Sequence, residues 1–191
     1  MGVARAWRDC FLRAVQEYEL AARLQAASRQ GKRAWTKGMT EAVVLTCRQM
    51  GWEASARGYP GATLPQSRSE YLNIDVMAFG SGEAGWSLPT AVMELENQQD
   101  DSYVAYNLWK LLCVTAELRV VYCYRAQPEA GAALVRTLNE QVIGALSISQ
   151  RTGLVGETAV VVGSRAAVET FPYGFFRWWR LEKNVGKIRP F

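Results

Sequence analysis

The fold of this chain is decided by residues 71–125, which contain four consecutive patterned segments. In order they are YLNIDVMAF (71–79), WSLPTAVMELENQ (86–98), DSYVAYNLWKLLCVTAEL (101–118) and RVVYCYR (119–125), and the glycine-rich loop GSGEAGWS (80–87) connects the first two. Alternating or β-branched residues predict strands in the first, second and fourth segments, and helical spacing predicts a helix in the third. The loop favours an antiparallel hairpin. This order of elements predicts a mixed α/β domain.

Three acidic residues lie on the two strands of this hairpin. Asp75 stands between the apolar residues Ile74 and Val76, and Glu94 and Glu96 lie near the end of the second strand. Side chains two positions apart on a strand share a face, so Glu94 and Glu96 point the same way. A buried carboxylate is costly unless something pairs with it. A hard divalent cation is the simplest partner for carboxylates that converge from neighbouring strands.

The sequence Asp75, then the acidic pair in 94–96, then a helix and a strand, resembles the core of the PD-(D/E)XK nuclease superfamily over roughly residues 38–125. The resemblance implies a restriction-endonuclease-like mixed sheet flanked by helices. It also implies Mg²⁺ or Mn²⁺ held by Asp75 and Glu94, with Glu96 as a further ligand or as a base that orients water. The implied activity is hydrolysis of phosphodiester bonds.

Two positions depart from the family pattern. Asn73-Ile74 replaces the proline that often precedes the aspartate, and Glu96 stands where the family usually has lysine, although some restriction enzymes of the superfamily carry glutamate there. The missing positive charge has a candidate in Lys110, on the polar side of the helix expected over residues 101–118. If this side of the helix faces the carboxylates, Lys110 replaces the family lysine. If it faces solvent, Lys110 is an ordinary surface residue.

Glu41 is a further acidic candidate. It lies in the first turn of a helix expected over residues 39–50, where the helix dipole favours an acidic side chain. In the nuclease superfamily an acid on this first core helix sometimes adds to the metal site, so the resemblance also admits Glu41 as a ligand. The sequence leaves both interpretations open.

The composition excludes several kinds of chemistry. The 191-residue chain contains no histidine, which removes Ser-His-Asp and Cys-His catalysis and histidine-ligated zinc sites. Its four cysteines are widely spaced and form no C-x-x-C pair, which favours reduced thiols. No apolar run is long enough to span a membrane, and the N-terminus lacks the apolar core of a secretory signal. We therefore expect a cytoplasmic protein without membrane association.

Charge is distributed unevenly along the chain. Residues 1–37 carry a net charge of +5, residues 38–163 of −5 and residues 164–191 of +4. An acidic centre between basic ends suits a metal site beside a rim that binds a polyanion such as DNA. The candidates for that rim are Lys32 and Arg33 in the polar segment 28–37, and Arg177, Arg180 and Lys183 in the aromatic and basic segment 171–183. The alternative is that these residues belong to solvated surfaces of ordinary helices and strands.

The remaining segments complete the expected domain. Residues 3–28 predict an amphipathic helix whose apolar side contains Trp7, Phe11, Val15 and Tyr18, which either packs on the domain or lies on nucleic acid. Segment 28–37 is expected to be a linker around Gly31. Strands are expected over residues 52–58 and 157–163, and a helix over residues 129–148.

These patterns predict one compact α/β domain, with a basic N-terminal helix and linker at 1–37 and a nuclease-like core at 38–191. The predicted function is metal-dependent hydrolysis of nucleic acid, with DNA favoured as the substrate. Two alternatives stay open. One is a domain of the same fold that binds nucleic acid without cleaving it, and the other is a protein-interaction domain within a larger assembly. Formation of a homodimer or of a larger complex is also left open.

Overall fold

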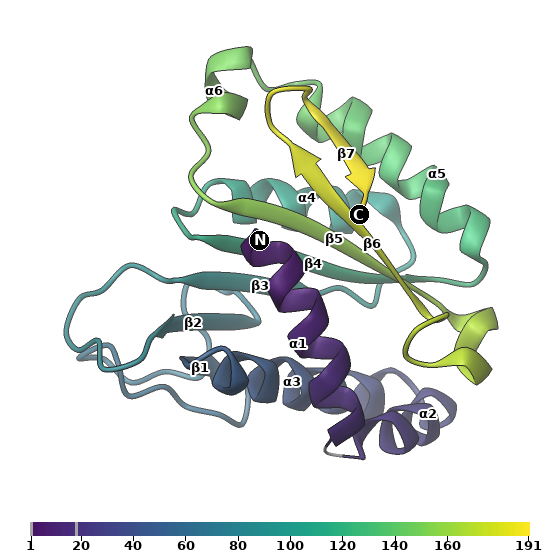
Figure 1. Ribbon diagram of the computed structural model, residues 1–191, viewed down its shortest axis with the longest axis horizontal. Helices are drawn as coiled ribbons and strands as arrows, with labels where there is room; N and C mark the ends of the chain where they lie inside the picture. The colour runs from purple at the N-terminus through teal and green to yellow at the C-terminus, as the bar shows by residue number, and fades with distance from the viewer. Residues whose placement is uncertain (1, 18) are drawn as a thin grey trace.

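The computed structural model, which describes residues 2–17 and 19–191, contains a seven-stranded mixed β-sheet with helices on both faces (Figure 1). The strands are β1 (Trp52–Ala56), β2 (Val76–Gly80), β3 (Ala91–Leu95), β4 (Leu118–Arg125), β5 (Glu157–Ser164), β6 (Phe176–Glu182) and β7 (Lys187–Pro190). They lie in the sheet in the order in which they occur along the chain. The predicted mixed α/β class is therefore confirmed.

The pairing of the strands determines where the predicted site residues lie. β1, β2 and β3 form an antiparallel meander, which confirms the predicted hairpin. β3, β4 and β5 are parallel, and the helices α4 (Asp101–Leu112) and α5 (Pro128–Leu138) lie in the two crossover connections. β5, β6 and β7 are antiparallel. Because β3, β4 and β5 are parallel, they end at one edge of the sheet, which we call the carboxyl edge.

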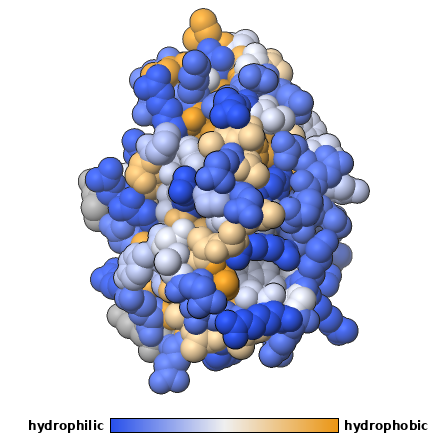
Figure 2. Space-filling view, turned by 90° about the vertical axis from the view of Figure 1, so that its right-hand side faces the viewer, coloured by the Kyte–Doolittle hydropathy of each residue, from blue (hydrophilic) through white to orange (hydrophobic). Residues whose placement is uncertain are grey.

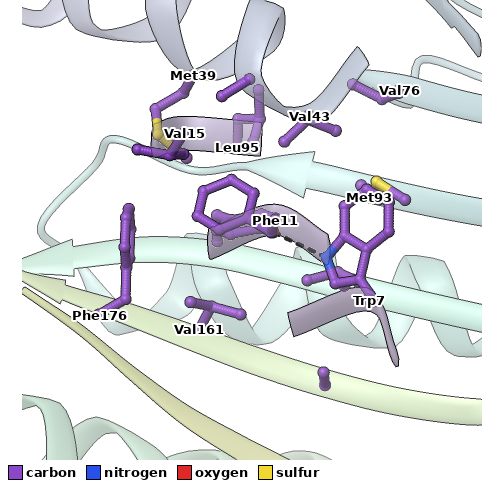
Figure 3. Close-up of a cluster of buried hydrophobic side chains, with 14 of the residues drawn as sticks. Trp7, Phe11, Val15, Met39, Val43, Val76, Met93, Leu95, Val161 and Phe176 are labelled. Carbon is purple, nitrogen blue, oxygen red and sulfur yellow. Dashed lines mark hydrogen bonds between the residues drawn. The ribbon is translucent and has the colours of Figure 1, made fainter. Parts of the chain in front are cut away.

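One face of the sheet is covered by α1 (Val3–Glu17), α2 (Leu20–Gln30) and α3 (Lys32–Gln49), and we call it the α1 face (Figure 1). Its core is rich in aromatic rings. Trp7 and Phe11 of α1 are fully buried against the strands (Figure 3), and Trp7 Nε1 donates a 2.9 Å hydrogen bond to the hydroxyl of Tyr122 on β4. The helix therefore packs on the domain through its apolar side.

The contacts of α1 also reach the last strands of the chain. The backbone N–H of Ala4 donates a 2.7 Å hydrogen bond to the Glu157 carboxylate on β5. Arg8 donates from Nη1 to the carbonyl oxygen of Phe191, 3.1 Å away, and its guanidinium lies over the ring of that residue. The beginning and the end of the sequence therefore pack together.

The other face, the α4 face, is covered by α4, α5 and the π-helical turn η1 (Asn139–Ile143). Its core is mainly aliphatic but contains a buried charge, Arg119 of β4, which is 1% exposed. The Arg119 guanidinium donates hydrogen bonds to the carbonyl oxygens of Leu111, Val114 and Val155. It thus satisfies carbonyl groups at the C-terminal end of α4, where helices leave acceptors unpaired.

Several helix boundaries differ from those expected. Residues 3–28 form two helices, which separate at Glu19, a residue in the left-handed region with φ of 53°. Tyr18, expected on the apolar side, lies outside the described residues. The segment expected as a linker is helical on both sides of Gly31, where φ is 107° and α2 and α3 meet. The helix expected over residues 129–148 is α-helical only as far as Leu138 and continues into η1.

Within the described part of the chain, no helix is long and apolar enough to cross a membrane. Cys10, Cys47 and Cys123 are buried, and Cys113 is exposed. The short helix α6 (Ile148–Thr152) precedes β5, and the 3₁₀ segment η2 (Arg165–Thr170) follows it at the carboxyl edge.

Candidate active site between β2, β3 and α4

Asp75, Glu94 and Lys110 lie together on the α4 face of the sheet. Asp75 immediately precedes β2, Glu94 is the fourth residue of β3, and Lys110 is in the last turn of α4. Antiparallel pairing of β2 with β3 places Val76 opposite Met93, and both point to the α1 face. The next residues along the two strands, Asp75 and Glu94, therefore lie opposite each other and point to the α4 face. The parallel crossover then folds α4 back over that face.

The Lys110 ammonium group contacts both Glu94 and the backbone of Asn73. Its Nζ lies 2.6 Å from Glu94 Oε1 and donates a 2.8 Å hydrogen bond to the backbone carbonyl of Asn73. Asp75 is fixed separately, because its Oδ2 accepts a 2.8 Å hydrogen bond from the backbone N–H of Leu95. The side chain of Glu94 is 5% exposed and that of Lys110 is 17% exposed, so the ion pair is shielded from water on most sides.

The electrostatics of the site favour protonation of its acids. Burial raises the pKa of Glu94 from the ordinary value of 4.5 to about 7, and the adjacent Asp75 carboxyl acts in the same direction, while Lys110 opposes both. Burial likewise raises the pKa of Asp75, and the hydrogen bond from the Leu95 N–H opposes it. Two acids with raised pKa values beside one ammonium group are typical of functional sites.

Glu96 and Glu41 do not join this group. Glu96 follows the last residue of β3, and its carboxylate accepts hydrogen bonds from the Gln98 backbone N–H at 2.6 Å and from Asn107 Nδ2 at 2.9 Å. It is nevertheless close enough to contribute to the raised pKa of Asp75. Glu41 accepts a hydrogen bond from Arg23 Nη1 at 3.1 Å, so it links α3 to α2.

The donor atoms match a hard cation only in part. Among residues 2–17 and 19–191, no cluster of three or more acidic or cysteine side chains has an arrangement able to hold a metal ion. Asp75 and Glu94 supply two carboxylates. Glu94 Oε1 is buried and lies 2.6 Å from Lys110 Nζ, and Glu94 also shares a hydrogen bond with the Asp75 carboxyl. Carboxylate oxygens are the ligands that a hard cation prefers.

The residues expected on a nucleic-acid rim are separated in the structure. They are Lys32 and Arg33 at the start of α3, and Arg177, Arg180 and Lys183 in or after β6. Arg177 is exposed and is paired with Val162 near the carboxyl edge. Arg180 points to the opposite face and lies 3.2 Å from Glu157, and Lys183 donates to the carbonyl of Leu154. Lys32, Arg33 and Arg177 thus remain the exposed members.

Two asparagines contribute to the site that sequence reasoning missed. Asn107, which is 8% exposed, holds Glu96 in place. Asn73 has φ of 57°, in the left-handed region, and its carbonyl accepts the hydrogen bond from Lys110. Asparagine tolerates this conformation better than most residues, so Asn73 directly before Ile74 and Asp75 was a usable turn signal. Asn107 had no comparable signal, because its partner is defined only by the packing of α4.

Comparisons of this chain with models of known protein families, with curated proteins and with solved structures found no match.

Proposed function

We propose that this protein is a metal-dependent nuclease that hydrolyses phosphodiester bonds in nucleic acid, with DNA as the favoured substrate. The observation that carries the proposal is the grouping of Asp75, Glu94 and Lys110 on one face of the sheet. Two carboxylates and one ammonium group are the functional groups that the resemblance to the PD-(D/E)XK superfamily leads us to expect.

The order of elements supports the same proposal. The resemblance rests on a strand with Asp75, a strand with Glu94, a helix and a further strand, and these correspond to β2, β3, α4 and β4. We therefore propose a restriction-endonuclease-like arrangement as the finer description of the fold. The lysine that the family usually has at position 96 is replaced here by Lys110, which reaches Glu94 from α4.

Asp75 and Glu94 would hold Mg²⁺ or Mn²⁺. Such an ion, when bound, lowers the pKa of a coordinated water and stabilises negative charge on a phosphate. Glu94 must lose its proton to act as a ligand, and its pKa of about 7 keeps that proton exchangeable near neutral pH. The Leu95 N–H keeps Asp75 oriented. Glu96, held by Asn107, is a candidate base rather than a ligand in this proposal.

Lys110 has the role of stabilising the charge that develops on the phosphate. A phosphoryl transition state gains negative charge, and a positioned cation stabilises it more than it stabilises the substrate. The Asn73 carbonyl fixes the Lys110 ammonium in position. Since Glu94 is its ionic partner in the structure, Lys110 is placed at the site before any substrate binds.

The test is a cleavage assay of the purified protein on single-stranded DNA, duplex DNA and RNA, with Mg²⁺, with Mn²⁺ and with EDTA. We expect cleavage of at least one substrate with either metal and none with EDTA. Lys187→Ala is the matched control for Lys110→Ala, because Lys187 is exposed on β7 and should leave the rate unchanged. Failure of every substrate in both metals would contradict the nuclease proposal.

One observation favours a second function, which is binding of nucleic acid without cleavage. Lys110 forms an ion pair with Glu94, and Glu96 stands in the position where the family usually has lysine. The Glu94–Lys110 pair is therefore also compatible with a purely structural role. In that case the protein binds DNA with strong salt dependence and cuts nothing in either metal. Binding isotherms measured beside the cleavage assay separate the two functions.

A further inference from the structure

A small pocket lies on the α1 face at the carboxyl edge, on the opposite side of the sheet from Asp75 and Glu94. Its volume is about 230 Å³. The lining residues that bear on its chemistry are Arg29, Lys32 and Arg165, and the aromatic residues Trp35, Tyr124 and Phe175. Figure 2 shows the side of the molecule that lies at the right of Figure 1, which includes α2. Hydrophilic side chains predominate on this side, and hydrophobic ones form small patches.

The rim of this pocket is positively charged. Lys32 and Arg165 are exposed, and neither has an ion-pair partner among the described residues. Arg29 has one acidic neighbour, Glu169, at 3.6 Å in a pair exposed to solvent. The pocket is thus surrounded by three cations and has a single carboxylate near its edge, so it favours an anion.

The N-terminus of α3 adds to this preference. α3 is an 18-residue helix that starts at the pocket, directly after Gly31. Gly31 provides no side chain to cap the helix, so the first backbone N–H groups are not satisfied by a side chain. Such a helix start carries partial positive charge and binds phosphate groups in many proteins.

Two buried polar atoms in the lining add to the polar character of the pocket. The Tyr124 hydroxyl and the Trp35 indole N–H belong to residues that are 1% and 4% exposed. The two groups interact with each other, but without the geometry of a well-formed hydrogen bond. Buried polar groups in native proteins are nearly always fully satisfied, so a polar ligand in the pocket would complete their hydrogen bonding.

We propose that this pocket binds the phosphate monoester of a single nucleotide, either a free nucleotide or the phosphorylated end of a nucleic acid strand. Lys32, Arg165 and the start of α3 contact the phosphate, and the nucleoside lies against the aromatic wall at Trp35 and Phe175. The volume of about 230 Å³ is below the roughly 300–1,000 Å³ usual for drug-sized ligands, so the pocket encloses part of a single nucleotide and the rest stays outside it.

This binding site does not depend on cleavage. It lies on the other face of the sheet from the candidate active site and uses none of its residues. Its test can therefore be run in EDTA, where no divalent cation is present. If only the nuclease proposal is wrong, the protein cleaves nothing but still binds the nucleotide in EDTA. If only the pocket proposal is wrong, the protein cleaves nucleic acid but does not bind the nucleotide in EDTA.

The experiment is isothermal titration calorimetry of the full chain in EDTA with adenosine 5′-monophosphate, adenosine and inorganic phosphate. We expect adenosine 5′-monophosphate to bind at least tenfold more tightly than adenosine. Arg165→Glu and Lys32→Glu should each weaken this binding about tenfold or more, because each reverses one charge at the phosphate. Arg136→Glu, an exposed reversal on α5, and Lys110→Ala in the candidate active site should bind like the parent protein.

Two further measurements sharpen the result. Tyr124→Phe removes the buried hydroxyl of the lining while keeping the ring, and it should weaken binding several-fold at an unchanged melting temperature. Short oligonucleotides with a 5′-phosphate or a 5′-hydroxyl distinguish the sources: preference for the phosphorylated end identifies strand ends, and equal binding of both identifies free nucleotides. If adenosine 5′-monophosphate binds no better than adenosine, or if Arg165→Glu behaves like Arg136→Glu, the proposal is overturned.

Discussion

The α1 face and the α4 face of the sheet bury different kinds of side chain. On the α1 face, rings pack on rings: Phe11 meets Tyr122, Phe176 and Trp178 at centroid distances of 5.4–5.8 Å. On the α4 face, aliphatic residues lie beside buried charged groups, among them Glu94, Arg119 and Arg125. Aromatic packing stabilises a fold without placing an ionisable group in the core. Buried charge destabilises a fold unless it is compensated, so its presence on one face locates the proposed active site there.

The compensation differs between Arg119 and Glu94. Arg119 donates to backbone carbonyls alone. Glu94 pairs instead with two side chains, Lys110 and the adjacent Asp75 carboxyl. The first arrangement uses backbone groups alone, and the second brings three ionisable side chains together. The predictions below test this difference, beginning with the largest expected effect.

Asp75→Ala and Glu94→Ala should each reduce cleavage below detection in Mg²⁺ and in Mn²⁺. Each change removes one of two proposed ligand carboxylates, and a single remaining carboxylate holds a divalent ion weakly. The measurement is a single-turnover cleavage assay, with circular dichroism to show that the variants are folded. Glu41→Ala is the matched control, since Glu41 pairs with Arg23 outside the site. Full activity in either site variant would remove that residue from the proposal.

Arg119→Met should lower the free energy of unfolding by about 3 kcal/mol. The change leaves the Val114 and Val155 carbonyls without their donor, whereas the Leu111 carbonyl still accepts from the Val114 N–H. Each buried unsatisfied group costs about 1–3 kcal/mol, partly offset by removal of a buried charge. Urea denaturation measures the effect, and the exposed Arg136→Met should stay within about 0.5 kcal/mol of the parent. A similarly small change at Arg119 would show that α4 needs no such anchor.

Lys110→Ala should lower the cleavage rate about a hundredfold with nearly unchanged affinity for nucleic acid. One lost donor to a developing oxyanion typically costs 10²–10³ in kcat. A comparison of kcat with the dissociation constant, measured in Ca²⁺ or EDTA, separates this role from binding. If Lys110→Ala cleaves at the parent rate, the ion pair with Glu94 is structural only.

The raised pKa of Glu94 predicts a pH-dependent stability. Because the folded-state pKa of about 7 lies above the ordinary 4.5, protonation favours the folded state, and this contribution is full below about pH 4.5 and lost by about pH 7. Glu94→Gln mimics the protonated acid. In EDTA it should match the parent near pH 4.5 and exceed it at pH 8 by on the order of 2 kcal/mol, or roughly 4–8 °C in Tm. An equal difference at both pH values would contradict the shift.

Charge reversal on β6 should give the smallest effect. Arg177→Glu should weaken DNA binding several-fold at low salt, because Arg177 is exposed near the carboxyl edge. Arg180→Glu should change it less, since Arg180 lies on the other face and pairs with Glu157. Fluorescence anisotropy across a salt series measures both. Equal weakening by the two variants would mean that the rim includes both faces of the sheet.

The sequence predicted what depends on local periodicity. The alternation in the second strand placed Glu94 and Glu96 on one face, and the register of β2 with β3 then brings Asp75 to Glu94. The helical wheel of residues 101–118 left two alternatives for Lys110, at the site or in solvent. Periodicity could not decide between them, because the answer depends on how α4 lies across the strands. It also failed at Arg119: a charged residue at the start of a strand is usually exposed, and only the carbonyls at the end of α4 make its burial favourable.

Local rules failed most clearly between residues 17 and 37. Gly31 and the surrounding polar residues suggested a linker, but the chain forms a tight junction between α2 and α3 there. A polar composition is shared by linkers and by the solvent side of helices, so it does not distinguish them. The apolar residues that anchor the junction, such as Trp35, find their partners in Tyr124 and Phe175 far along the chain.

The packing of α1 against the last strands has a consequence for biosynthesis. Ala4 and Phe11 are translated early, but Trp178, which packs on Phe11, and Glu157, the acceptor for the Ala4 N–H, leave the ribosome more than a hundred residues later. Until then α1 has an apolar side with no complete surface to cover it. Such nascent segments bind chaperones or aggregate. The rate of synthesis of β5 and β6 therefore determines how long this helix depends on outside protection.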